Sequence, residues 1–143
     1  QTGKADREKL TNFYKDLNIK YKVESFIKNM GEVYSNCDLV ISRAGAMTIS
    51  ELIATHTPSI LLPLPWATDG HQTLNAKYLE SIGATKVIDS DKKNISEFAL
   101  VLKDLSIDKE KRLSMSNSAK LAYLPNVAKV IFNKINESLQ GKA

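Results

Sequence analysis

The sequence predicts an α/β domain with a Rossmann-like parallel sheet flanked by helices, and three features predict it. Short apolar segments that suit buried strands alternate with longer segments whose apolar residues recur at helical spacing. Short connections join these segments, which favours parallel strands with right-handed crossovers. The 143 residues suffice for one domain with a sizeable core.

The first third of the chain supplies two helices and two strands. Residues 5–17 carry one apolar stripe at helical spacing and predict an amphipathic helix. Residues 21–26 alternate polar and apolar side chains and predict a strand. Asn29 is a candidate N-cap for a short helix that ends near residue 36. Residues 38–42 are an apolar run, typical of a strand buried on both faces.

The middle of the chain repeats the strand and helix pattern. Residues 48–55 predict a helix with Leu52 and Ile53 toward the core. Residues 59–64 predict the next buried strand. We place Pro63 at the C-terminal end of this strand, because proline has no N–H group for a central ladder.

The remaining elements are one strand and four helices. Residues 70–81 predict a helix with Gly83 in the left-handed conformation after it, and residues 84–89 predict the last strand. Helices are then expected from Asn94 as N-cap to residue 105, from Asp108 to about residue 122, and from Pro125 in the first turn to about residue 139. The apolar residues expected to face the core are Leu74, Tyr78, Leu79 and Ile82, then Ile95, Phe98, Leu102 and Leu105, then Val127, Val130, Ile131 and Ile135.

Composition excludes several classes of function. The net charge is +4, but the lysines are scattered and no basic stripe or aromatic-basic motif predicts nucleic-acid binding. The scattered charge indicates a solvated surface, with weak attraction to an anionic membrane as the alternative. Cys37 is the only cysteine and the two histidines are isolated, so we expect no disulfide, no metal site and no cofactor. No apolar run approaches the roughly 20 residues of a membrane span. Because the sequence opens on Gln1, we expect a fragment or a processed product.

Small and polar residues follow the strand at 38–42. The turn at residues 42–46 is small, so a ligand can approach its backbone, and the N-terminus of the next helix favours phosphate. Thr48 offers a hydroxyl, and the Glu51 carboxylate can accept hydrogen bonds from two sugar hydroxyls. Thr48 and Glu51 also match a Thr-x-x-Glu capping box, which leaves a purely structural role open.

A second turn, at residues 65–70, leads into His71, Gln72 and Asn75. Amide side chains suit sugars, because each amide both donates and accepts hydrogen bonds. The carboxyl ends of parallel strands share one edge of a sheet, so both turns predict a single binding site. The alternative is a polar helix N-terminus capped by Asp69. At the same edge, Phe26, Ile27 and Met30 either line a pocket for a planar base or pack in the core.

These residues also carry a resemblance. The run SRAGAMTISELIATHTPSILLPLPWATDGHQTLNAKYLESIGA, with QTGK and VESFIKNMGEVYSNCDLVISRAG before it, resembles the C-terminal domain of the bacterial peptidoglycan N-acetylglucosaminyltransferases of glycosyltransferase family 28. The resemblance extends from Gln1 to about Ile135. The combination of S-R-A/S-G-A-x-T-x-S-E with H-Q-x-x-N-A is its most specific part. Many members have Gln where His71 stands.

The resemblance implies the donor half of a two-domain GT-B transferase, which moves N-acetylglucosamine from UDP-N-acetylglucosamine to lipid I with inversion. It implies that Phe26 and Ile27 meet the uracil, that Met30 lines the nucleotide pocket and that Glu51 holds the ribose. The complete set implied for the donor is Phe26, Ile27, Met30, Ser42, Gly45, Ala46, Met47, Thr48, Glu51, His71, Gln72 and Asn75. The product would be lipid II, made at the cytoplasmic face of the cell membrane by a peripheral enzyme.

The resemblance also implies what these residues lack. The family's acceptor-binding N-terminal domain, its proposed catalytic base, and the first strand and glycine-rich loop of the donor domain are not among them, so we expect no catalytic residue here and no transferase activity from this chain alone. Three alternatives stay open: a donor subunit of a split dolichol-pathway transferase, a fragment of a UDP-N-acetylglucosamine epimerase, and a non-catalytic interaction module.

Overall fold

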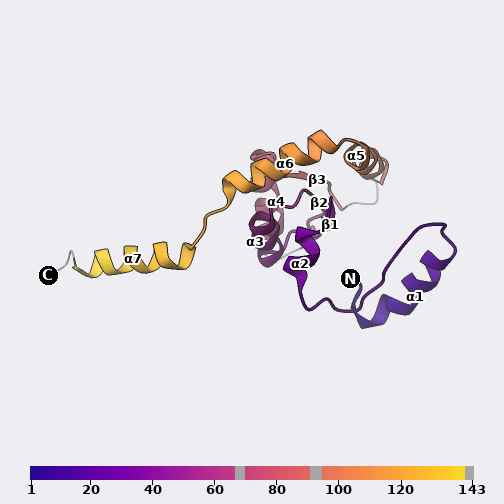
Figure 1. Ribbon diagram of the computed structural model, residues 1–143, viewed down its shortest axis with the longest axis horizontal. Coiled ribbons are helices and arrows are strands. Elements are labelled where there is room, and N and C mark those ends of the chain that lie inside the picture. Colours follow the sequence, from indigo (N-terminus) through magenta and orange to yellow (C-terminus); the bar gives the residue numbers. More distant parts are fainter. Residues whose placement is uncertain (67–69, 91–94, 141–143) are drawn as a thin grey trace. The chain divides into compact units, whose positions relative to one another are not determined.

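A computed structural model describes residues 1–66, 70–90 and 95–140, which form two compact units, Gln1–Val33 and Tyr34–Ala143 (Figure 1). The first unit contains helix α1, Gly3–Lys15, as the apolar stripe predicts. The strand predicted at residues 21–26 is wrong: the carbonyls of Glu24 and Ser25 accept hydrogen bonds from the N–H groups of Thr2 and Gly3, at 3.0 and 3.2 Å. Alternation alone does not make a strand where the backbone bonds instead to the start of a helix that is distant in the sequence.

Helix α2, Met30–Ser35, begins where Asn29 predicts it. The Asn29 Oδ1 accepts from the backbone N–H of Glu32 at 3.3 Å, which satisfies one of the N–H groups at the helix start. This N-cap confirms the assignment made from the sequence.

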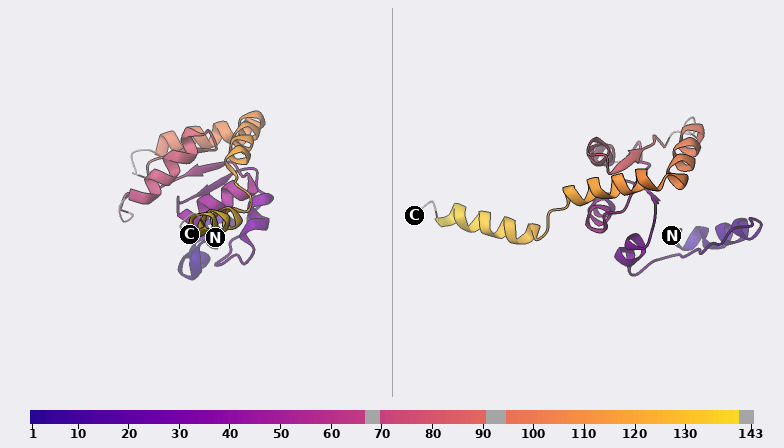
Figure 2. Two further views of the ribbon diagram at one scale, coloured as in Figure 1. Left: turned by 90° about the vertical axis from the view of Figure 1, so that its left-hand side faces the viewer. Right: turned by 45° about the horizontal axis from the view of Figure 1, so that its top comes forward.

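The second unit is built on three parallel strands: β1, Val40–Ser42; β2, Ser59–Leu61; and β3, Thr85–Val87. They lie in the order β1-β2-β3, with Ile41 opposite Ile60 and Ile60 opposite Lys86. Helices surround the strands in the views of Figures 1 and 2. The predicted parallel α/β fold is therefore confirmed. Pro63 lies beyond the ladder, as its missing N–H group requires.

Within the described residues, five helices complete this unit: α3, Ala46–Thr55; α4, His71–Ser81; α5, Ile95–Ile107; α6, Lys109–Ala122; and α7, Val127–Gln140. Helix α3 packs on both α4 and α6, and α4 packs on β3. The core contains Leu52, Ile60, Leu61, Leu79 and Leu105, each at most 2% exposed. The predicted N-cap Asn94 lies outside the described residues.

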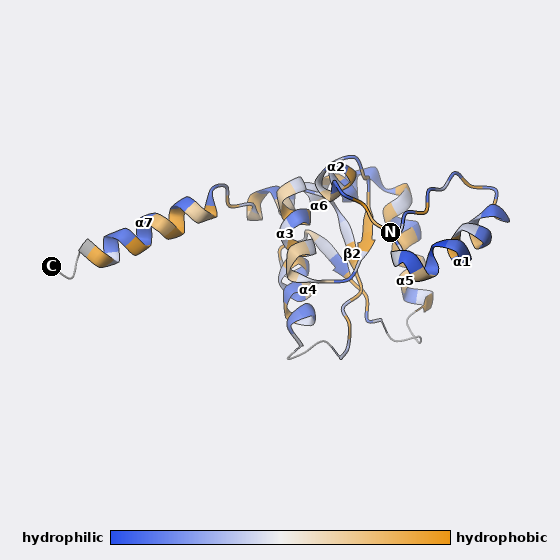
Figure 3. Ribbon diagram, turned by 90° about the horizontal axis from the view of Figure 1, so that it is seen from below, coloured by the Kyte–Doolittle hydropathy of each residue, from blue (hydrophilic) through white to orange (hydrophobic). Residues whose placement is uncertain are grey.

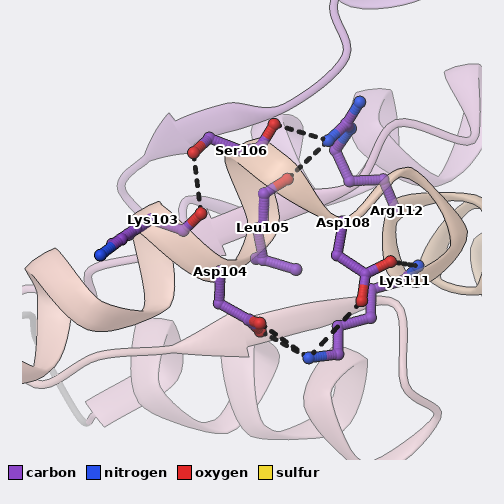
Figure 4. Close-up of polar contacts among 7 residues, drawn as sticks. All are labelled: Lys103, Asp104, Leu105, Ser106, Asp108, Lys111 and Arg112. Atoms are coloured by element: carbon purple, nitrogen blue, oxygen red, sulfur yellow. Dashed lines mark hydrogen bonds and ion pairs between the residues drawn. The ribbon is translucent and has the colours of Figure 1, made fainter.

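The corner between α5 and α6 is fixed by polar side chains (Figure 4). Helix α6 begins where predicted, and Asp108 is its N-cap: the Asp108 Oδ1 accepts from the N–H of Lys111 at 3.0 Å. The Lys111 Nζ donates to Asp104 at 2.7 Å, and this hydrogen bond raises the pKa of the lysine. Arg112 donates to the carbonyls of Leu105 and Ser106, which lie at the C-terminal end of α5.

Several residues expected in the core are exposed. In α4 the buried side chains are Ala76 and Leu79, whereas Leu74 and Tyr78 are 64% and 57% exposed. Ile41 is 46% exposed, so β1 is not buried on both faces. In α5 the Ile95 side chain is exposed. Helical spacing and an apolar run identify a shared face, but they do not supply an element that covers it.

Helix α7 differs from the prediction in the same way. Its apolar residues alternate with polar ones along the helix (Figure 3), as the spacing predicts. They are nevertheless exposed rather than packed inward, at 47% for Val127, 52% for Val130 and Ile131, and 54% for Ile135. Pro125 precedes the first residue of the helix by two positions, with Asn126 in a left-handed conformation between them.

Candidate functional site

Two strand-to-helix turns lie side by side at the carboxyl edge of the sheet. The first runs from the end of β1 at Ser42 to the start of α3, and the second, described for residues 62–66 and Gly70, from the end of β2 to α4. The strands are neighbours and parallel, so the turns share one edge, as predicted. The Arg43 Nη1 also donates to the carbonyl of Leu62 at 3.0 Å, which links the two turns directly.

The first turn leaves backbone open to a ligand. Gly45 is extended, and a Cβ added there would meet nothing closer than the Thr48 Oγ1 at 4.0 Å. Helix α3 begins at Ala46, and the N–H groups of its first turn belong to Ala46, Met47 and Thr48. Such groups have no carbonyl partner within a helix and favour anions. The Met47 side chain is 78% exposed, so this end of the helix is accessible.

The capping-box interpretation of Thr48 and Glu51 is wrong. Gly45 is the N-cap of α3 and makes no side-chain cap, and Thr48 is the third residue of the helix. A capping box needs its hydroxyl at the N-cap position. The chain becomes helical after Gly45, so the Thr48 hydroxyl lies three residues too late. Glu51 therefore has no capping-box role at the start of α3.

Tyr34 interacts with two of the four predicted ligand residues of α3, Thr48 and Glu51. It is 7% exposed, and its side chain is hydrogen-bonded to that of Thr48. Burial raises the pKa of the Tyr34 phenol, the Glu51 carboxylate raises it further, and the Thr48 hydrogen bond opposes the shift. Tyr34 is thus a buried neighbour of both Thr48 and Glu51. Sequence reasoning missed this arrangement, since helical spacing marks Tyr34 only as a core residue.

The second turn orients one of the predicted amides. The Gln72 Oε1 accepts from the backbone N–H of Leu64 at 3.2 Å, so the opposite end of the amide is its N–H₂ donor group. Gln72 and Asn75 are half-buried, one turn apart on α4, and His71 is exposed. Gly70 precedes the helix in a left-handed conformation. The expected cap Asp69 lies outside the described residues.

Ser42 joins the turns through its backbone. Its carbonyl accepts from the N–H of Leu62 at 2.9 Å, and its hydroxyl donates to the carbonyl of Arg43 at 3.1 Å. The structure thus gathers Ser42, Gly45, Ala46, Met47, Thr48, Glu51, His71, Gln72 and Asn75 on one unit.

The residues predicted for the base belong to the other unit. Phe26 is 69% exposed, and Ile27 and Met30 are half-buried. The N–H of Ile27 donates to the Gln1 Oε1 at 3.2 Å. Phe26 does not pack in the core of its unit, and contact of these three residues with a base stays a prediction.

An open pocket of about 240 Å³ lies at the opposite, amino edge of the sheet. It is lined by the segments that precede β1 and β2 and by α6, and it includes none of the predicted site residues. Among the described residues, no cluster of three His, Cys, Asp or Glu side chains is placed to hold a metal ion. Within the same residues, no helix combines the length and apolarity that crossing a membrane requires.

Comparison with known proteins identifies the family of this chain. The family described as Glycosyltransferase family 28 C-terminal domain matches residues 1–131. Enzymes named UDP-N-acetylglucosamine–N-acetylmuramyl-(pentapeptide) pyrophosphoryl-undecaprenol N-acetylglucosamine transferase are similar in sequence. The one from Pseudomonas savastanoi pv. phaseolicola is 38% identical over 141 residues, which are 99% of this chain and 40% of that protein. The one from Marinobacter nauticus is 35% identical over 99% of this chain and 39% of its own length.

The fold is also that of a solved relative. The crystal structure of Acinetobacter baumannii MurG matches with a TM-score of 0.86 at 32% identity, over 96% of this chain and 42% of the MurG chain. This chain thus spans about two fifths of the length of the relatives it matches. From the matched domain, the sequence identity and the shared fold together, the chain belongs to the glycosyltransferase family 28 C-terminal domain family.

Proposed function

We propose that the chain binds UDP-N-acetylglucosamine at the carboxyl edge of its sheet. The observation that carries this proposal is the pairing of an accessible helix N-terminus on α3 with an oriented amide on the adjacent turn. A nucleotide sugar presents the complementary groups: a diphosphate for the helix N-terminus and hydroxyls for carboxylate and amide side chains. The names of the similar proteins specify this donor.

The diphosphate would lie at the first turn of α3. There the N–H groups of Ala46, Met47 and Thr48 would donate to it, and Gly45 leaves room for its oxygens. Glu51, one turn further along the helix, would accept from the ribose hydroxyls. Phe26, Ile27 and Met30 would contact the uracil.

The sugar would lie beside α4. The Gln72 N–H₂ group would donate to a sugar oxygen, and His71 and Asn75 would contact its hydroxyls. Each contact is made by a side chain in the first two turns of one helix. The geometry of that helix therefore sets the spacing of the sugar contacts.

The complete protein would transfer N-acetylglucosamine to lipid I and form lipid II, with this chain as its donor-binding domain. The names of the similar proteins state both donor and acceptor. The acceptor-binding domain and the catalytic residues would lie outside these 143 residues, and the whole enzyme would act at the cytoplasmic face of the membrane without spanning it. This chain alone would bind the donor without transferring its sugar.

Calorimetric titration of UDP, with uridine and ADP as controls, tests the proposal. UDP should bind more tightly than either control, because only UDP offers both uracil and diphosphate. Glu51→Ala should weaken UDP binding by about 1.5–3 kcal/mol, the usual contribution of a charge-assisted hydrogen bond, whereas Glu137→Ala on the exposed face of α7 should not. Equal affinity for UDP and ADP, or an unaffected Glu51→Ala variant, would contradict the proposed site.

A further inference from the structure

Three side chains continue the hydrogen bonding of the sheet beyond the end of β2. The segment Leu62–Leu64 follows the last paired residue of that strand and leads toward α4. Its backbone groups bond to side chains of three different elements. Arg43 donates to the carbonyl of Leu62 at 3.0 Å, Ser90 donates to the carbonyl of Pro63 at 2.8 Å, and Gln72 accepts from the N–H of Leu64 at 3.2 Å.

These three bonds hold the backbone of the Leu62–Leu64 segment in place. Pro63 is buried and its carbonyl needs a partner, which the half-buried Ser90 hydroxyl supplies from the loop after β3. Arg43 holds the preceding carbonyl from the turn after β1. The next N–H then meets the Gln72 amide on α4. All three strands thus contribute to the position of one peptide segment.

We propose that Arg43 and Ser90 are positioning residues that set the selectivity of this site for the sugar of its donor. They hold the Leu62–Leu64 segment, and that segment fixes which end of the Gln72 amide faces the ligand. The inference rests on the proposed function, because it requires the Gln72 N–H₂ group to donate to the sugar.

The chemistry of the amide explains why its support matters. A backbone N–H can only donate, so Leu64 must meet the Gln72 oxygen, and the amide nitrogen then points the other way. If the segment moves, the amide can rotate and offer its oxygen or no group at all to the sugar. Binding sites need their polar groups held to about 0.5 Å, and side chains beyond the ligand contacts provide that restraint.

Loss of this support should weaken the binding only of a ligand that carries the sugar. The variant is Ser90→Ala, and the measured quantity is the ratio of the dissociation constant for UDP to that for UDP-N-acetylglucosamine. We expect this ratio to fall about fivefold, the effect of losing one neutral hydrogen bond, while the affinity for UDP stays unchanged. Ser90→Thr keeps a hydroxyl and should restore the ratio. Arg43→Lys keeps the charge but loses the planar fork, and it should lower the ratio as well.

Ser81→Ala is the matched control. The Ser81 hydroxyl also donates to a backbone carbonyl, that of Tyr78 at 2.7 Å, but at the far end of α4. A change in folding stability alone would lower the urea midpoint of Ser90→Ala without changing the ratio. An unchanged ratio in both Ser90→Ala and Arg43→Lys, with UDP still bound, overturns the positioning role. A wild-type chain that binds neither UDP nor UDP-N-acetylglucosamine overturns the proposed function instead.

Discussion

Two buried hydroxyls that join β2 to β3 allow a quantitative test of the sheet that supports the site. The Ser59 Oγ donates to the Thr85 Oγ1 at 2.9 Å, and the Thr85 Oγ1 donates to the carbonyl of Ser59 at 2.8 Å. The residues are 1% and 2% exposed, so water cannot replace a lost partner. Thr85→Val keeps the shape of the side chain and removes both hydrogen bonds.

The expected free energies differ between the single and double variants. Thr85→Val loses hydrogen bonds and leaves the Ser59 hydroxyl buried without an acceptor, which should cost about 2–4 kcal/mol. Ser59→Ala loses one bond while Thr85 keeps its bond to the carbonyl, which should cost about 1 kcal/mol. The double variant contains no orphaned hydroxyl. It should therefore be as stable as Thr85→Val or more stable.

Urea unfolding followed by far-UV circular dichroism measures these differences at all four corners of the cycle. The informative comparison is Ser59→Ala in the two backgrounds. It should destabilise the wild type, and it should be neutral or stabilising when Thr85 is already Val. If it costs about 1 kcal/mol in both backgrounds, the two hydroxyls do not interact and the reasoning fails.

Three further predictions follow from individual contacts. Gln72→Glu keeps an oxygen for the Leu64 N–H and loses the N–H₂ donor, so calorimetry should show weaker binding of UDP-N-acetylglucosamine relative to UDP, and an unchanged ratio would rule out the sugar contact. Asp108→Ala removes the N-cap bond to Lys111 and should lower the free energy of unfolding by about 0.5–2 kcal/mol, with Asp108→Asn close to wild type. The raised pKa of Tyr34 means that the folded state holds this proton more tightly, so its contribution to stability is present below pH 10.0 and lost as the pH rises through the folded pKa. Urea unfolding at about pH 8 and 11 should show that Tyr34→Phe loses less unfolding free energy at the higher pH than the wild type does. An equal loss in both proteins would contradict the raised pKa of Tyr34.

Local chemistry in the sequence predicts most of the elements and the edge at which the proposed site lies. The N-cap at Asn29, the helix start at Asp108 and the left-handed Gly83 are set by interactions within a few residues, and the structure confirms all three. The parallel order of the strands follows from short connections and the alternation of strand with helix. These features need no knowledge of distant partners.

What the sequence could not predict depends on distant partners. Residues 21–26 have the composition of a strand, but their carbonyls bond to the start of the chain. Leu74 and Tyr78 have helical spacing but remain exposed. Within the site, Arg43 lies in the recognisable motif, whereas Ser90 has no local signal because its partner Pro63 is 27 positions away. Such roles become visible only when the backbone brings the two segments together.

Gly83 has a consequence for how this domain can vary. It has φ of +79°, and a Cβ there would meet the Ser118 Oγ at 3.3 Å and the Ser118 Cβ at 3.9 Å. Any replacement would strain the backbone after α4 and also press against α6. A smaller residue at position 118 would relieve the contact but not the backbone strain. Glycine should therefore be retained at residue 83 among homologous chains, whatever residue stands at position 118.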